Sequence, residues 1–481
     1  MGDMRKASGG LVVVLGLLGA GCGSVSDNHP TPNLVPGGGI GSGKINGYLN
    51  VYVTDDDTRA PIMGASVRVG PSANSMPCEA LTDSTGLATF DPQSCKSLNG
   101  PVTVTASDSG YAPSTWIGAD GANMTMTIRA MHPTPVDTAT VSGTIAGWES
   151  LPAPATGHNT IAIIAASQAP NLGDRGNNLT QPMRDIAVAG SAVTTSIPAN
   201  ACVRGALVDD CNWQLVTRTG LQAHYAIIVD DDQNGTPNDM TDDVLTVAGW
   251  ALDTGLNLTA GQTVVSEMLT MVAAGDMQPF TVSFPTLPAG MSYLASYPEI
   301  NLGDAGRIAI VFPVLGASLT MTRVPKIGAS TTGGLAGGTY DLLAAAQATK
   351  DLNEPASLAW LHGLDVSKTV AVPAWLPPPT AIMDAGGTYG FTPVTGATLH
   401  SAEIKNPDGS RAWSVTIFDG STSFTLPGVT PDPLVGGTDT VTISALQIPG
   451  VDLGNVAFDD AQQALTALSS DQIPSRTSAR R

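Results

Sequence analysis

The sequence predicts an all-β protein, a series of antiparallel β-sandwich modules on a flexible N-terminal tether. Short apolar runs alternate with polar residues at period two, which is the pattern of a strand with one buried face. The 54 glycines and 35 prolines recur between these runs, where they indicate turns. At 481 residues, the chain has room for about three domains.

The clearest domain covers residues 45–131. Several of its runs alternate, and Val102, Val104 and Ala106 are separated by polar residues. The regions that follow repeat the pattern of short apolar runs between turns. We expect β-rich domains at 138–277 (with an acidic loop), 278–367 and 368–455, and a tail at 456–481.

Two Ala-containing segments have an alternative interpretation as helices. The first covers residues 342–352, and Asp341 would be suited to its N-cap. The second covers residues 459–468. Runs this short do not distinguish a helix from a buried strand.

Three segments of the first domain resemble the carboxypeptidase regulatory-like (transthyretin-like) family. Residues 53–67 are similar to its opening hairpin, and residues 82–90 (Thr-Asp-Ser-Thr-Gly-Leu-Ala-Thr-Phe) to its T-D-x-x-G-x-A-x-F turn and strand. Residues 102–111 resemble the strand that follows. The resemblance implies an Ig-like or transthyretin-like sandwich in an accessory role, and it implies no activity.

The N-terminus has the parts of a secretory signal over residues 1–21: Arg5 and Lys6, an apolar run, and small residues at the end. Cys22 follows directly, and the segment resembles the lipobox of bacterial lipoproteins, with Gly19 where these have Leu. The resemblance implies a lipid on Cys22, a membrane partner through that lipid and, because Gly23 follows, the outer membrane. Residues 22–44 would form the flexible tether.

The remaining four cysteines favour disulfides. Cys78 and Cys95 form one sequence-local pair, and Cys202 and Cys211 form another. An oxidising compartment outside the cytoplasm permits both bridges. The alternative is four reduced, buried thiols.

The candidate metal site is the acidic run after the apolar residues 225–229. Oxygens at its first, third and fifth positions and glycine at its sixth are typical of a Ca²⁺-binding loop. The expected ligands are Asp230, Asp232, Asn234, Thr236, Asp239 and Asp242. The bound Ca²⁺ would be structural. The alternative is a solvated hairpin, because Asn-Gly is a common two-residue turn.

The formal charge of −20 argues against nucleic-acid binding. The H-E-x-x-H and G-x-S-x-G signatures of zinc peptidases and α/β-hydrolases do not occur in the sequence. We therefore expect a non-catalytic cell-envelope lipoprotein whose β modules bind an envelope protein or a polysaccharide, or serve a structural role. The alternative is an exported hydrolase, or a carbohydrate-active or carbohydrate-binding protein, with a site in residues 138–455.

Overall fold

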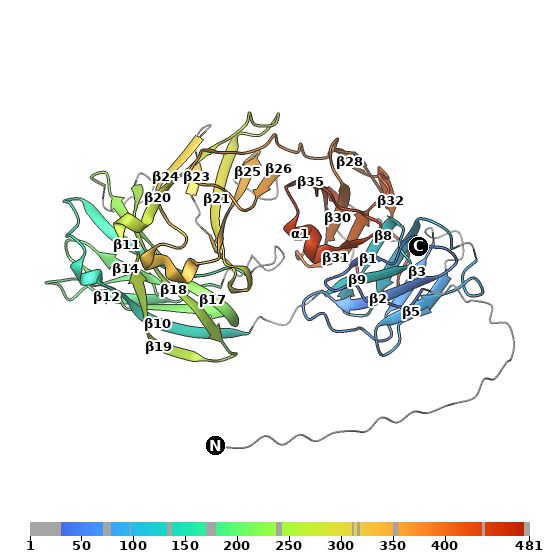
Figure 1. Ribbon diagram of the computed structural model, residues 1–481, viewed down its shortest axis with the longest axis horizontal. Coiled ribbons are helices and arrows are strands. Elements are labelled where there is room, and N and C mark those ends of the chain that lie inside the picture. The colour runs from blue at the N-terminus through green and yellow to red at the C-terminus, as the bar shows by residue number, and fades with distance from the viewer. Residues whose placement is uncertain are drawn as a thin grey trace, which may run out of the picture.

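The protein has two β-rich lobes, which Figure 1 shows side by side. The computed structural model describes residues 30–70, 78–96, 98–131, 137–169, 179–236, 243–309, 312–314, 318–349, 355–434 and 438–475. We call the described residues between 137 and 375 the middle lobe, and those at 30–131 and 376–475 the terminal lobe. The predicted signal peptide and Cys22 lie outside the described residues.

One sheet connects the two lobes. Its thirteen described strands follow the order β22-β21-β25-β26-β35-β33-β30-β31-β8-β6-β3-β4, and β23 also pairs with β21. Their bounds are β22 Arg307–Ala309, β21 Tyr293–Asn301, β25 Thr339–Gln347, β26 Ala356–Leu361, β35 Ala467–Ser475, β33 Asp439–Gln447, β30 Leu399–Lys405, β31 Arg411–Ile417, β8 Ser114–Ala119, β6 Val102–Ser107, β3 Ser66–Val69, β4 Cys78–Leu81 and β23 Phe312–Val314. The lobes meet where β26 pairs with β35, with Ala356 opposite Ser470.

The middle lobe also holds an eight-stranded sheet and two small sheets among its described residues. The large sheet follows the order β15-β14-β11-β17-β18-β19-β10-β16, and the small ones are β12-β13 and β24-β20-β27. Their bounds are β15 Asp209–Asp210, β14 Ala201–Arg204, β11 His158–Ala166, β17 Gly220–Asp232, β18 Val244–Leu258, β19 Thr263–Met271, β10 Thr138–Ala146, β16 Trp213–Arg218, β12 Met183–Ala187, β13 Thr194–Pro198, β24 Ser318–Pro325, β20 Met277–Ser283 and β27 Val370–Ala371. Two cores fill this lobe, one of them around Trp213 and the other around Trp250.

The terminal lobe completes its sandwich with a sheet of order β34-β1-β9-β2-β5, in which β7 also pairs with β9. A smaller sheet, β28-β29-β32, covers the C-terminal part. The bounds are β34 Val456–Ala457, β1 Gly39–Gly41, β9 Asn123–Ala130, β2 Leu49–Asp55, β5 Leu87–Phe90, β7 Tyr111–Ala112, β28 Thr380–Asp384, β29 Thr388–Thr392 and β32 Ser423–Thr425. The α-helix α1 spans Phe458–Gln463, and 3-10 helices span Trp148–Ser150, Ala274–Asp276, Gly303–Ala305 and Ser330–Leu335.

The all-β prediction is confirmed, and the alternating runs of the first domain form the strands β2, β3, β6 and β9. The antiparallel pattern has exceptions, since β9 runs parallel to β2, and β8 parallel to β31.

Residues of the motif at 82–90 have structural roles in the turn. Buried Thr82 accepts a hydrogen bond from the Ala65 N–H (2.9 Å) and donates one to the Ile62 carbonyl (2.6 Å). Gly86 has φ +77°, and a Cβ there would lie 2.7 Å from the Val53 carbonyl oxygen.

The described residues of the predicted tether, 30–44, lie against the terminal lobe. β1 lies between β9 and β34, and Ile40 is buried in the terminal-lobe core. Gly39 permits this approach, because its φ is +138° and a Cβ would lie 2.0 Å from the Val456 carbonyl oxygen. The buried amide of Asn123 donates to the Thr31 carbonyl at 3.1 Å. The prediction is therefore wrong for this docked segment, whose glycines allow close packing.

The alternative of a helix at 342–352 is excluded for most of that segment, because residues 339–347 form the strand β25 between β21 and β26. Both faces of that inner strand are largely covered, so its apolar run lacks clear alternation. The second segment contains a helix, α1. The predicted tail at 456–481 is wrong for 456–475, which form β34, α1 and β35. Among the described residues, no helix is long and apolar enough to span a membrane.

The expected domain boundaries do not coincide with the edges of the sheets. β8, from the 45–131 region, pairs with β31, from the 368–455 region. The core around Trp250 joins residues of the 138–277 and 278–367 regions. Neighbouring regions therefore share sheets and cores. That each predicted domain is an independent unit remains a prediction.

Candidate functional site

The predicted Ca²⁺ ligands Asp230 and Asp232 lie on a strand. β17 extends to Asp232 and pairs with β11 and β18 along its acidic end. Side chains alternate along a strand, so Asp230 and Asp232 share one face, while Asp231 is buried on the other. The turn begins afterwards, where the Asn234 N–H donates to Asp232 Oδ1 at 3.0 Å.

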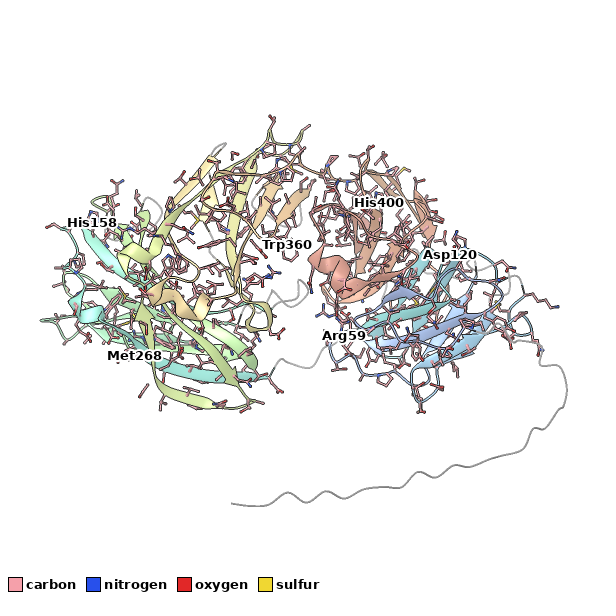
Figure 2. The ribbon with its side chains drawn as sticks, in the orientation of Figure 1. Arg59, Asp120, His158, Met268, Trp360 and His400 are labelled. Atoms are coloured by element: carbon pink, nitrogen blue, oxygen red, sulfur yellow. A yellow bond between two sulfur atoms is a disulfide. The ribbon has the colours of Figure 1, made fainter. Side chains whose placement is uncertain are left out.

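The partner of these two carboxylates is His158. Its Nδ1 lies 3.1 Å from Asp230 Oδ2, and its Nε2 lies 3.7 Å from Asp232 Oδ1. Figure 2 places His158 on the outer side of the middle lobe. The Thr236 hydroxyl donates to the Gln233 carbonyl at 3.0 Å, and Asp239 and Asp242 lie outside the described residues. Within the described ranges, no group of three or more His, Cys, Asp or Glu side chains is arranged to hold a metal.

Both predicted disulfides are present. The Cα atoms are 5.4 Å apart in the Cys78–Cys95 bridge and 4.3 Å apart in the Cys202–Cys211 bridge. The first joins the edge strand β4 to the turn after β5, which belongs to the facing sheet. The second joins β14 to the segment that leads into β16, near opposite ends of the eight-stranded sheet.

A buried ionic network lies at the end of the thirteen-stranded sheet. Glu299 on β21 stands directly opposite Asp341 on β25, and both side chains are almost completely buried. Like charges in that position repel each other. Arg307 on the adjoining strand β22 offsets this repulsion, because its Nη1 pairs with Asp341 and lies 3.4 Å from Glu299 Oε2.

Asp341 is the centre of this network. His362 Nδ1 lies 3.0 Å from its Oδ2, and the Gly363 N–H donates to its Oδ1 at 3.1 Å. Asn301 donates a further hydrogen bond at 3.2 Å. Burial raises the pKa of Asp341, but the hydrogen bonds from His362, Gly363 and Arg307 outweigh it and hold that pKa below its ordinary value. The carboxylate is therefore kept ionised.

Strand alternation determines which face carries this network. Ile300, Ile308 and Leu342 are fully buried in the middle-lobe core on the opposite face. On the network's face, the guanidinium of Arg307 lies 4.9 Å from the centre of the Trp360 ring. Figure 2 shows Trp360 on the side of the middle lobe that faces the terminal lobe.

A cleft of about 470 Å³ opens beside the network, between the two lobes. One wall comes from the ends of β21, β22, β25 and β26, and includes Asp341 and His362. The other wall comes from α1. Its volume lies within the range of small-molecule sites, roughly 300–1,000 Å³. The cleft is the strongest candidate site in the part of the chain that the structure describes.

A second buried pair consists of His224 on β17 and Glu267 on β19. His224 Nδ1 lies 2.9 Å from both carboxylate oxygens, and its side chain is fully buried. His224 shares the face of β17 that carries Ala226 and Ile228, which pack in the core around Trp213. The pair therefore lies in the interior of that sheet.

Sequence reasoning did not identify the residues of the cleft. Asp341 was considered only as the N-cap of the alternative helix at 342–352, and Glu299 and Arg307 were not singled out. A signal was present, because Glu299 stands beside Ile300, and Asp341 between Tyr340 and Leu342, in otherwise apolar runs. A charge within such a run indicates a buried pair or a site.

Comparison of the sequence with known protein families and with curated proteins finds no match. Among solved structures, the chain is similar to the Bacillus anthracis TIE protein (9% identity, 68% of this chain and 49% of that one, TM-score 0.14). It is also similar to the full-length major pilin SpaD from Corynebacterium diphtheriae (10% identity, 63% and 87%, TM-score 0.14). A third is BcpA, the major pilin subunit of Bacillus cereus (9% identity, 68% and 97%, TM-score 0.14). The chain spans about half the length of the first of these, and its all-β fold rests on its own strand pairings.

Proposed function

We propose that this protein is a non-catalytic bacterial cell-envelope lipoprotein that holds a β-rich binding scaffold close to the outer membrane. The observation that carries the proposal is the pair of disulfides, since such bridges persist in oxidising compartments outside the cytoplasm. In this proposal, residues 1–21 act as the signal peptide that directs export. Cys22 accepts the lipid that anchors the protein to the membrane.

The docked N-terminal segment supports a position near the membrane. Residue 30 already lies against the terminal lobe, because Asn50 donates to the Pro30 carbonyl at 3.1 Å. A chain extends by at most about 3.6 Å per residue, so the stretch from Cys22 to Pro30 spans at most about 30 Å. The lipid would therefore hold the terminal lobe close to the bilayer surface.

We further assign residues 45–131 to the carboxypeptidase regulatory-like class. The support is the turn at 82–90, in which Asp83 Oδ1 accepts hydrogen bonds from the N–H groups of Thr85 (2.8 Å) and Leu87 (3.1 Å). Ala88 and Phe90 then point into the core. Each motif residue thus has a structural task, which agrees with an accessory, non-catalytic role.

The test is mass spectrometry of the mature protein purified from the membrane fraction of a bacterial host. We expect an N-terminus at Cys22 carrying acyl chains, and a Cys22→Ser variant that is released from the membrane. Lys44→Ser is the matched control and should stay membrane-bound. An unacylated N-terminus elsewhere would overturn the anchor.

The alternative is an exported hydrolase or carbohydrate-active protein, and the cleft at Asp341 is the observation that favours it. A hydrolase screen of the same preparation separates the two. Turnover that disappears in a single-residue variant of the cleft, such as His362→Gln, would replace the non-catalytic proposal.

A further inference from the structure

We propose that the cleft between the lobes binds a neutral, polyhydroxylated ligand, a segment of a saccharide chain. This goes beyond the envelope role and does not depend on a lipid at Cys22. Three features carry it: the composition of the helix wall, the charge of the cleft, and a buried nitrogen of His362 without a hydrogen-bond partner.

The wall of the cleft formed by α1 presents polar side chains to the cleft. Phe458, Ala461 and Leu465 pack into the terminal-lobe core. Asp459, Gln462 and Gln463, at spacings of three and four residues, line the cleft. An amide both donates and accepts hydrogen bonds, as a hydroxyl group does. Two adjacent glutamines on this wall therefore suit a ligand with several hydroxyl groups.

The charge of the cleft disfavours an anion. Arg307 is the one arginine or lysine among the described lining residues, and the buried carboxylates of Asp341 and Glu299 are already paired with it. Asp304 and Asp459 add negative charge at the rim. Asp459 is compensated in part by Arg59, whose Nη2 lies 3.4 Å from its Oδ1. A neutral ligand meets no uncompensated repulsion there, whereas a phosphate or carboxylate would.

The third feature is His362 Nε2. This nitrogen is buried and has no hydrogen-bond partner among the described residues, while Nδ1 is held by Asp341. A buried polar atom without a partner is unfavourable. The side chain is 28% exposed at the cleft, so a small ring movement would let a ligand hydroxyl donate to Nε2.

The two walls are fixed relative to each other before any ligand arrives. β26, which leads into His362, pairs with β35, which follows α1, and the Trp360 N–H donates to the Thr466 carbonyl at 2.8 Å. A site that needs little ordering loses less affinity on binding. The cleft is therefore preorganised by the same strand pairing that joins the lobes.

The test uses the purified full-length protein on a glycan array of neutral and anionic glycans, followed by calorimetry with the best neutral oligosaccharide and with spermidine. We expect a neutral glycan to bind, and Gln462→Ala/Gln463→Ala to weaken it roughly 10-fold or more. His362→Ala should weaken it similarly. Gln93→Ala, an exposed glutamine of the terminal lobe outside the cleft, is the matched control and should leave affinity unchanged.

Three results would overturn the assignment: no neutral glycan binding, binding of anionic glycans or spermidine alone, or unchanged affinity in the double glutamine variant. The double variant alters only exposed positions of α1, so it should fold normally, and its thermal melting curve checks this. None of these results bears on the acylation of Cys22, so the failure of one proposal leaves the other standing.

Discussion

Two acidic regions of the middle lobe have opposite origins. Asp230 and Asp232 are two positions apart in sequence, and their side chains are 44% and 45% exposed. Glu299, Arg307 and Asp341 come from three strands, and their side chains are at most 6% exposed. The local run is conspicuous in the sequence, but its two carboxylates are partly exposed to solvent. The dispersed network is inconspicuous but is enclosed by the fold, and it forms one wall of the cleft.

The difference shows what burial does to a charge. An exposed ion pair exchanges water for a partner at little net gain, typically about 0–1 kcal/mol. A buried charge has lost its water, so its partner becomes indispensable, and removing one member costs about 3–5 kcal/mol. Chemistry that needs fixed charges is therefore more readily built from the network than from the acidic run.

The largest expected effect is that of Arg307→Ala. It leaves Glu299 and Asp341 buried and facing each other without their cation, and we expect a loss of about 3–5 kcal/mol in the free energy of unfolding. Chemical denaturation measures it. Arg59→Ala, which removes an exposed partner of Asp459, is the control, with an expected loss under about 1 kcal/mol. Equal losses in the two variants would contradict the greater cost of removing a buried partner.

The free energy of unfolding should depend on pH through Asp341. Its folded pKa lies below the unfolded value, so its contribution is fully present above about pH 4 and is lost as the pH falls through the folded pKa. We expect wild type to exceed Asp341→Asn in stability at neutral pH, and the gap to narrow in acid. Denaturation curves at stepped pH measure the gap, and one that stayed constant into strong acid would contradict an ionised Asp341.

The smallest effect is expected in the acidic run. Asp232→Asn removes a partly exposed partner of His158, so the loss without Ca²⁺ should be below about 1 kcal/mol. We propose that this run still binds a structural Ca²⁺, with ligands from Asp230 to Asp242. Calorimetry with Ca²⁺ should then show uptake by wild type and weaker uptake by Asp232→Asn. No uptake by wild type would refute the metal site.

Much of the fold was accessible from the sequence because its causes are local. Period-two alternation predicted β2, β3, β6 and β9, and spacing predicted both disulfides. The elements that the sequence left open or misassigned have non-local causes. Both faces of β25 are largely covered, so its residues lack clear alternation, and β35 is a strand because β33 and β26 pair with it on either side.

The sequence by itself determined the strand-rich character of the chain, its turns and its cysteine pairs, since each depends on residues close together along the chain. Only the tertiary structure decided that β26 meets β35, that the Gly-rich segment at 39 packs between two strands, and that Arg307 reaches Asp341. The physical reason is that burial and charge pairing depend on which strands become neighbours. Local periodicity does not encode that choice, and the cleft depends on it.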